Sequence, residues 1–277
     1  MSQFNRGKWI MWSGVSVCVL GLALLIWTPF SKPSLEKSTI VLTPTAGMQA
    51  PAGDGDVLTI LYSGDGGWAD LDKQLGNAFV ARGIPVLGIN SFKYFWRGRD
   101  PDNCAAELDA LMTKYLAKWH KRRVWLVGFS FGADVLPTFI DKLSPTNRAR
   151  ITQLVLLSPS RDTSFEIQFE GYMITQGRFK AFVKTLLEKF NKVPHYNALP
   201  PVVAIKDQFP VVCYYGKEEA DDSLCTDPAL PAWVTVHAKN GDHHFAGGYQ
   251  PLAVQMVNEL PAASASAPAP AASTAQP

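Results

Sequence analysis

The stretch VGFSFGAD, residues 127–134, decides how the rest of this sequence is interpreted. It places Gly128, Ser130 and Gly132 in the spacing Gly-x-Ser-x-Gly, between an apolar run and a segment with helical character. A strand, a tight turn and a helix in this order are typical of a nucleophile elbow, where small residues flank the serine because a larger side chain would collide with neighbouring backbone. The alternative is an ordinary strand-to-helix turn in which Ser130 caps the helix.

Apolar runs alternate with helix-like segments on both sides of this stretch. Continuous Val, Ile and Leu strands predict a mostly parallel sheet with helices on both faces, and therefore an α/β fold. Functional residues are expected at the carboxyl ends of the strands. The expected strands are 57–62, 85–90, 124–127, 151–157, 211–215 and 233–237, and the expected helices are 70–82, 101–119, 131–141 and 249–259.

A nucleophilic serine needs a base, and in this fold class the base follows the acid along the chain. The last expected strand leads into NGDHHFAGG, residues 240–248, which places two histidines in a loop before the closing helix. We expect His244 to be the base, with His243 as the second choice. The alternatives are a surface loop or a metal site, but only Asp242 lies nearby as a further ligand.

The acid is expected in the loop after the preceding strand, VVCYYG, which runs into KEEADDSLC. Glu219 is the first choice and Asp222 or Asp221 the fallback, although a solvated acidic loop is the common alternative. Cys213 and Cys225 bracket this loop and are able to pair in an oxidising compartment. Such a disulfide would hold the acid in place.

Two further features concern the oxyanion and the remaining cysteines. The glycine-rich run SGDGGW, residues 63–68, follows the first strand and predicts an oxyanion hole made by the backbone N–H of Phe131 and that of Asp65 or Gly66. A tight turn before a helix is the alternative. Cys104 is left as a buried or free thiol, Cys18 lies in the apolar N-terminus, and the cysteine spacing matches no zinc pattern. We expect no metal and no cofactor.

The 277 residues, of which 47% are hydrophobic and 18% charged, suit one globular domain with a sizeable core. The formal net charge is +2, but four basic residues and one acidic residue lie within residues 1–37, so the rest of the chain is nearly neutral. This balance argues against direct nucleic-acid binding.

The N-terminus carries an apolar run at residues 9–30, preceded by Arg6 and Lys8. Its length and its terminal tryptophans predict a signal anchor in the inner membrane, with residues 1–8 cytoplasmic and the domain facing the periplasm. A cleaved signal sequence, which would leave a soluble periplasmic protein, is the alternative. Residues 31–55 are expected to be a stalk with an edge strand at 39–42, residues 56–260 the domain, and residues 261–277 a disordered Ala/Pro/Ser tail.

Several motifs together resemble a known family. SGDGGWADLD, INSFKYFWRGRDPD, VGFSFGADVLP, FEIQFEGYM and YYGKEEADDSLC followed by GDHHF are similar to the bacterial virulence protein VirJ and the C-terminal half of AcvB. The resemblance covers about residues 55–260. It implies an α/β-hydrolase fold, a periplasmic location, association with type IV secretion components and, for AcvB-like members, hydrolysis of lysyl-phosphatidylglycerol. It also implies Ser130 as the nucleophile, with His244 or His243 as the base.

The resulting hypothesis is a membrane-associated serine esterase acting on an aminoacylated phospholipid. An exported binding or adaptor protein with little catalysis is the alternative. We expect Trp68, Trp96, Arg97 and Arg99 to contact the substrate, because arginine suits phosphate, although a surface loop is an equally simple interpretation. The segment 160–205, with an amphipathic helix near 178–190, is expected to cover acyl chains or else to pack as an ordinary cap.

Overall fold

The computed structural model describes residues 32–45, 48, 50, 54–96, 98–165 and 196–262. The chain divides into two units, residues 1–32 and 33–277, and the account below concerns the second. The expected membrane segment 9–30, the helix near 178–190 and nearly all of the tail lie outside the described residues. Among the residues that are described, no helix is long and apolar enough to cross a membrane.

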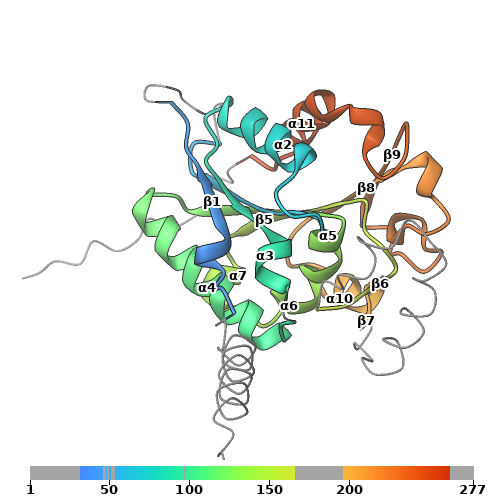
Figure 1. The fold of residues 1–277 in the computed structure, drawn as a ribbon, viewed down its shortest axis with the longest axis horizontal. Coiled ribbons are helices and arrows are strands. Elements are labelled where there is room, and N and C mark those ends of the chain that lie inside the picture. Colours follow the sequence, from blue (N-terminus) through green and yellow to red (C-terminus); the bar gives the residue numbers. More distant parts are fainter. Residues whose placement is uncertain are drawn as a thin grey trace, which may run out of the picture. The chain divides into compact units, whose positions relative to one another are not determined.

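Seven of the strands in the described ranges form one sheet (Figure 1). Its order is β1-β3-β2-β4-β5-β8-β9, and every neighbouring pair is parallel except β1 with β3. This confirms the expected mostly parallel sheet. The expected strand at residues 39–42 is present as the antiparallel edge strand β1. The strands are β1 (Thr39–Leu42), β2 (Val57–Tyr62), β3 (Val86–Ile89), β4 (Arg123–Phe129), β5 (Ile151–Leu157), β8 (Val211–Gly216) and β9 (Thr235–Lys239).

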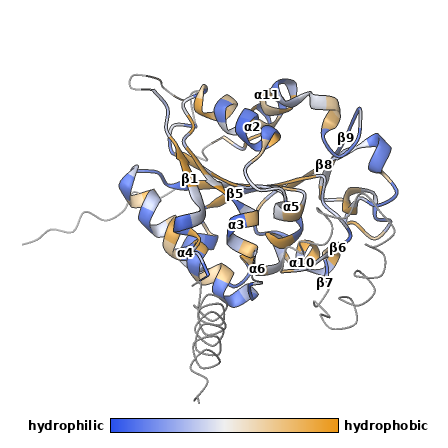
Figure 2. Cartoon of the chain, viewed as in Figure 1, coloured by the Kyte–Doolittle hydropathy of each residue, from blue (hydrophilic) through white to orange (hydrophobic). Residues whose placement is uncertain are grey.

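Helices cover both faces of the sheet (Figure 1). One face carries α2 (Asp70–Val80) and α11 (Tyr249–Asn258), and the other carries α3 (Ser91–Phe95), α4 (Pro101–Lys118), α6 (Pro137–Ile140) and α10 (Leu199–Ala204). Side chains alternate along a strand, so Leu58 and Ile60 of β2 enter one core while Val57 and Leu61 enter the other. All of β2 is therefore buried, as the continuous apolar run predicted. The apolar colouring of the sheet in Figure 2 shows the same pattern.

The helix expected at 131–141 is broken into two pieces. The first is α5 (Phe131–Val135) and the second is α6, which begins at Pro137. Proline lacks the N–H that a continuous helix would need there, so the interruption has a local cause. A short helix, α7 (Pro145–Arg148), then leads to β5.

The segment 160–205 contributes a small hairpin-like pair where it is described. β6 (Asp162–Thr163) pairs antiparallel with β7 (Tyr196–Asn197), so the two ends of the intervening segment lie together. Phe165, at the end of the first described part, is 4% exposed and packs in the main core. Phe165 therefore packs in the core, as the cap-packing alternative for this segment predicted.

Candidate active site

Ser130 occupies a strained turn between β4 and α5. Its φ of +51° and ψ of −122° lie outside the regions that a residue with a side chain normally adopts. A Cβ atom on Gly128 would lie 2.5 Å from the carbonyl oxygen of Gly132, and one on Gly132 would lie 2.5 Å from the carbonyl oxygen of Tyr62. Only glycine fits at either position, which is the physical reason for the Gly-x-Ser-x-Gly spacing.

The Ser130 backbone is tied to the neighbouring strand. Its N–H donates to the carbonyl oxygen of Leu157 at 2.8 Å, and its own carbonyl accepts from the N–H of Asp134 at 3.0 Å. Within the described part of the chain, the Ser130 side chain makes no capping hydrogen bond to α5. The turn therefore presents the hydroxyl without committing it to the helix, and the capping alternative is not what the structure has.

The base and the acid meet at the carboxyl ends of β8 and β9. Nδ1 of His243 lies 2.5 Å from Oε2 of Glu219, and Oε1 of the same carboxylate accepts from the N–H of Gly216 at 3.1 Å. The side chains of His243 and Glu219 are 37% and 18% exposed. The His243 ring also packs 5.3 Å from the ring of Phe129, the residue before Ser130. This brings one imidazole, one carboxylate and the elbow to the same edge of the sheet.

Of the two adjacent histidines, His243, the second choice from the sequence, contacts the Glu219 carboxylate, and His244 does not. The N–H of Phe245 bonds to the carbonyl of Asp242 at 2.9 Å, and the Phe245 side chain is buried. This tight turn leaves His244 exposed, with its ring 5.6 Å from that of Phe129. His243 therefore contacts Glu219 and His244 does not, because the turn geometry determines which ring reaches that carboxylate.

Glu219 has a pKa below its ordinary value. Burial raises the pKa of this carboxyl, but hydrogen bonds from His243, Ser158 and the Gly216 N–H outweigh the burial. The carboxylate is therefore ionised at neutral pH, as an orienting acid must be. The fallback acids Asp221 and Asp222 are both exposed, and neither contacts a histidine among the residues that are described.

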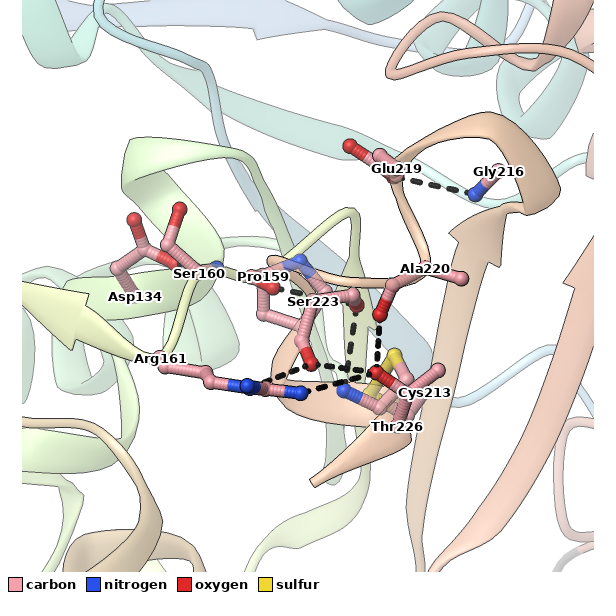
Figure 3. The surroundings of a disulfide bond; sticks show 11 residues. Asp134, Pro159, Ser160, Arg161, Cys213, Gly216, Glu219, Ala220, Ser223 and Thr226 are labelled. Carbon is pink, nitrogen blue, oxygen red and sulfur yellow. Dashed lines mark hydrogen bonds between the residues drawn. A yellow bond between two sulfur atoms is a disulfide. The ribbon is translucent and has the colours of Figure 1, made fainter. Parts of the chain in front are cut away.

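The predicted disulfide between Cys213 and Cys225 is present (Figure 3). Cys213 lies in β8 and Cys225 in η3 (Leu224–Thr226), so the bond closes the loop that carries Glu219. The same loop is held from outside, because the Leu224 N–H donates to the Pro159 carbonyl at 2.9 Å. Cys104 is the free, buried thiol that the sequence predicted.

The sequence interpretation missed two residues near this site, Asp134 and Ser158. Asp134 is 7% exposed, and its Oδ1 accepts a hydrogen bond from the N–H of Ser160 at 2.7 Å. Figure 3 shows both residues near the loop that carries Glu219. Burial raises the pKa of Asp134 well above its ordinary value. Ser158 is 1% exposed and donates to the carbonyl of His243 at 3.1 Å. A polar residue directly after a buried strand was the available signal for Ser158.

The glycine-rich loop after β2 lies beside the elbow. A Cβ on Gly64 would be 3.4 Å from Cβ of Ser130, and Asp65 and Gly66 are the exposed central residues of a turn closed by the Gly67 N–H and the Gly64 carbonyl at 3.1 Å. Phe131 follows Ser130 as the first residue of α5. The structure therefore places the expected oxyanion loop next to Ser130.

Two of the residues expected to contact the substrate have partners within the fold. Trp68 fills the space over Gly88, where a Cβ would meet its ring at 2.3 Å, and it packs with the α2 side of the core. The Arg99 guanidinium stacks 4.3 Å from the ring of Tyr94 and pairs with Glu107 at 3.4 Å, with only 8% of the side chain exposed. Both residues stabilise the fold, because packing and a partly buried ion pair occupy their polar and aromatic surfaces.

The other two expected substrate contacts have different outcomes. Trp96 is 37% exposed, and its ring lies 4.8 Å from that of Phe92. Arg97 lies outside the described residues. Among the residues that are described, no group of three His, Cys, Asp or Glu side chains is arranged to hold a metal ion.

Comparison with known proteins gives a family and a fold. The family described as bacterial virulence protein (VirJ) matches residues 56–264. No curated protein matches the chain. Among solved structures, a proline iminopeptidase of Mycobacterium smegmatis is 11% identical, with 80% of this chain and 93% of that chain covered and a TM-score of 0.52.

Two esterases are similar to the same degree. An esterase of Pyrococcus furiosus is 16% identical, with 84% and 92% covered and a TM-score of 0.51. An esterase of Exiguobacterium antarcticum is 11% identical, with 80% and 94% covered and a TM-score of 0.50. At these identities the likeness establishes the α/β-hydrolase fold and not a particular activity.

Proposed function

Since the chain belongs to the VirJ family of bacterial virulence proteins, we propose that it is a serine esterase whose nucleophile is Ser130. The observation that carries this proposal is the meeting of three features at one edge of the sheet. These are the strained elbow at Ser130, the 2.5 Å contact of His243 with Glu219, and the packing of the His243 ring on Phe129. A structural serine would need none of them.

In the proposed mechanism, Ser130 Oγ attacks the ester carbonyl carbon while Nε2 of His243 accepts the hydroxyl proton. The carboxylate of Glu219 stabilises the imidazolium that forms, because it accepts a hydrogen bond from the Nδ1–H group of His243. His243 then gives its Nε2 proton to the departing alcohol oxygen as the carbon–oxygen bond of the ester breaks. The product of this half-reaction is an acyl group attached to Ser130.

Water completes the cycle through the same groups. His243 accepts a proton from the water, whose oxygen attacks the acyl carbon, and the proton returns to Ser130 Oγ when the acyl bond breaks. The negative charge on the carbonyl oxygen is held in each half by backbone N–H groups, for which we propose Phe131 with Asp65 or Gly66. Their positions beside Ser130 support this role.

We further propose that the substrate is the aminoacyl ester of a phospholipid such as lysyl-phosphatidylglycerol. The motif resemblance to AcvB-like proteins and the apolar segment at residues 9–30 support this substrate. A domain tethered at a membrane reaches a headgroup ester without extracting the lipid. We propose a periplasm-facing location and contact with type IV secretion components on the same resemblance.

The test uses the full chain in phosphatidylglycerol vesicles that contain lysyl-phosphatidylglycerol. Wild type should release lysine and should react with a fluorophosphonate probe at Ser130. Ser130→Ala, checked for folding by circular dichroism, should do neither. If wild type is labelled but releases no lysine, the proposal of a serine esterase stands and lysyl-phosphatidylglycerol is rejected as its substrate. Wild type that is neither labelled nor active would reject the enzyme and favour a binding or adaptor role.

A further inference from the structure

Ser158 stands at the junction of the three loops that carry the proposed catalytic groups. It follows β5, which lies between β4 and β8 in the sheet. Its N–H donates to the carbonyl of Tyr214 in β8 at 2.8 Å, while the preceding carbonyl, that of Leu157, accepts from Ser130 at 2.8 Å. The backbone at this point therefore links the nucleophile strand to the acid strand.

The Ser158 side chain connects the same point to the loop of the proposed base. Its Oγ donates to the carbonyl oxygen of His243 at 3.1 Å. The hydroxyl has one proton, so this bond commits it to the His243 loop.

The backbone of Ser158 indicates that this hydroxyl has a specific use. Its φ is +49°, a left-handed conformation that glycine adopts far more readily than serine. The residue is also 1% exposed, so solvent offers no reason for a polar side chain here. Residues held in such conformations by their surroundings cluster at functional sites.

We propose that Ser158 is a positioning residue, whose hydroxyl holds the His243 backbone so that the imidazole meets Glu219 beside Ser130. This inference rests on the proposed function for its catalytic consequence, but the contact itself does not depend on any substrate. The hydroxyl bonds to the carbonyl of the residue whose Nδ1 lies 2.5 Å from Oε2 of Glu219, so removing it changes how that ring is held against the acid.

The test compares two variants that separate the hydroxyl from the backbone. Ser158→Ala removes the hydroxyl and keeps the unfavourable φ, whereas Ser158→Gly removes the hydroxyl and relieves the backbone. Without this donor the His243 carbonyl loses its partner, and the loop that carries the ring is held less tightly. Both variants should therefore shift the NMR resonances of the His243 ring protons.

The NMR comparison has an internal control and needs no substrate. The ring protons of His237, which bonds to Glu259 at 3.0 Å, should keep their wild-type resonances in both variants. In the same proteins, fluorophosphonate labelling of Ser130 should slow about tenfold. Ser158→Gly should be at least as heat-stable as Ser158→Ala, because glycine adopts the positive φ at this position more readily. Slow labelling in the more stable variant would then not be explained by unfolding.

Different results reject different statements. If both variants keep the wild-type His243 ring resonances and label as wild type does, while Ser130→Ala is unlabelled, the role of Ser158 is wrong and the esterase stands. If only Ser158→Ala is impaired, the backbone and not the hydroxyl is responsible, which also overturns the inference. If wild type is not labelled at all, the proposed function fails, and the His243 ring resonances alone decide whether Ser158 positions that ring.

Discussion

The carboxylate of Glu219 lies 2.5 Å from Nδ1 of His243 although 24 positions separate the two residues in the chain. β8 and β9 are parallel neighbours, so the loops that leave their carboxyl ends emerge side by side. One loop supplies the carboxylate and the other the imidazole. This pairing distinguishes two adjacent histidines that the sequence presents as near equivalents, and it leads directly to the first prediction.

His243→Ala should abolish fluorophosphonate labelling of Ser130, with a loss on the order of 10³-fold or more, because no other imidazole in the described part of the chain contacts Glu219. His244→Ala is the matched control and should label within a few-fold of wild type, since this ring is exposed and makes no contact with Glu219 among the described residues. Second-order labelling rates measure both. The reverse outcome would restore His244 as the base.

Glu219→Gln should reduce labelling on the order of 10³-fold, because an amide cannot stabilise the imidazolium and is able to hold the wrong tautomer. Asp222→Asn, three positions later in the same loop, should have little effect because its side chain is exposed. Rates of p-nitrophenyl butyrate hydrolysis as a function of pH would check this pair. Equal losses in the two variants would mean that general loop charge, and not one carboxylate, matters.

Breaking the disulfide should lower both stability and activity. Cys213→Ser with Cys225→Ser removes a crosslink over a sequence separation of 12 and should cost about 3 kcal/mol in the free energy of unfolding. Activity at a temperature where the variant remains folded should also fall, since the crosslink closes the Glu219 loop. Cys104→Ala, at the free buried cysteine, is the control: urea unfolding should show a loss, but the folded variant should keep its rate.

Asp72 should make the protein less stable as pH rises. Its side chain is fully buried, Oδ2 accepts from the Ala69 N–H at 3.0 Å, and Oδ1 has no partner among the described residues. Burial raises its pKa from 3.8 to about 7. The folded state therefore keeps a proton that the unfolded state releases, so stability is fully present below about pH 4 and falls until about pH 7.

The size of the Asp72 effect is at most about 4 kcal/mol. Asp72→Asn retains an oxygen that can accept from Ala69 and removes the titration, so its urea-unfolding free energy should change less between pH 4 and pH 7 than that of wild type. The comparison isolates Asp72, because the other titrating groups are the same in both proteins. Identical pH dependence in the two proteins would exclude a raised pKa at this residue.

Much of the fold was predictable because strand and helix signals are local. The expected strands at 57–62 and 151–157 match β2 and β5 residue for residue, since both are mostly apolar runs and almost all of their residues are buried. The helix expected at 131–141 was wrong in its continuity, because Pro137 interrupts it. Trp68 and Arg99, expected to contact the substrate, make packing and ion-pair contacts within the fold, because aromatic and cationic side chains suit such contacts as well as binding.

The amino-acid sequence alone determined the elbow at Ser130, the alternation that makes the sheet parallel, and the bracketing of Glu219 by two cysteines, since each depends on neighbours along the chain. Only the tertiary structure decided that Glu219 meets His243, and that Ser158 bonds to the His243 carbonyl. These contacts join residues from different strands, and their geometry depends on turn conformations and on sheet register. Neither is encoded by any short stretch of residues.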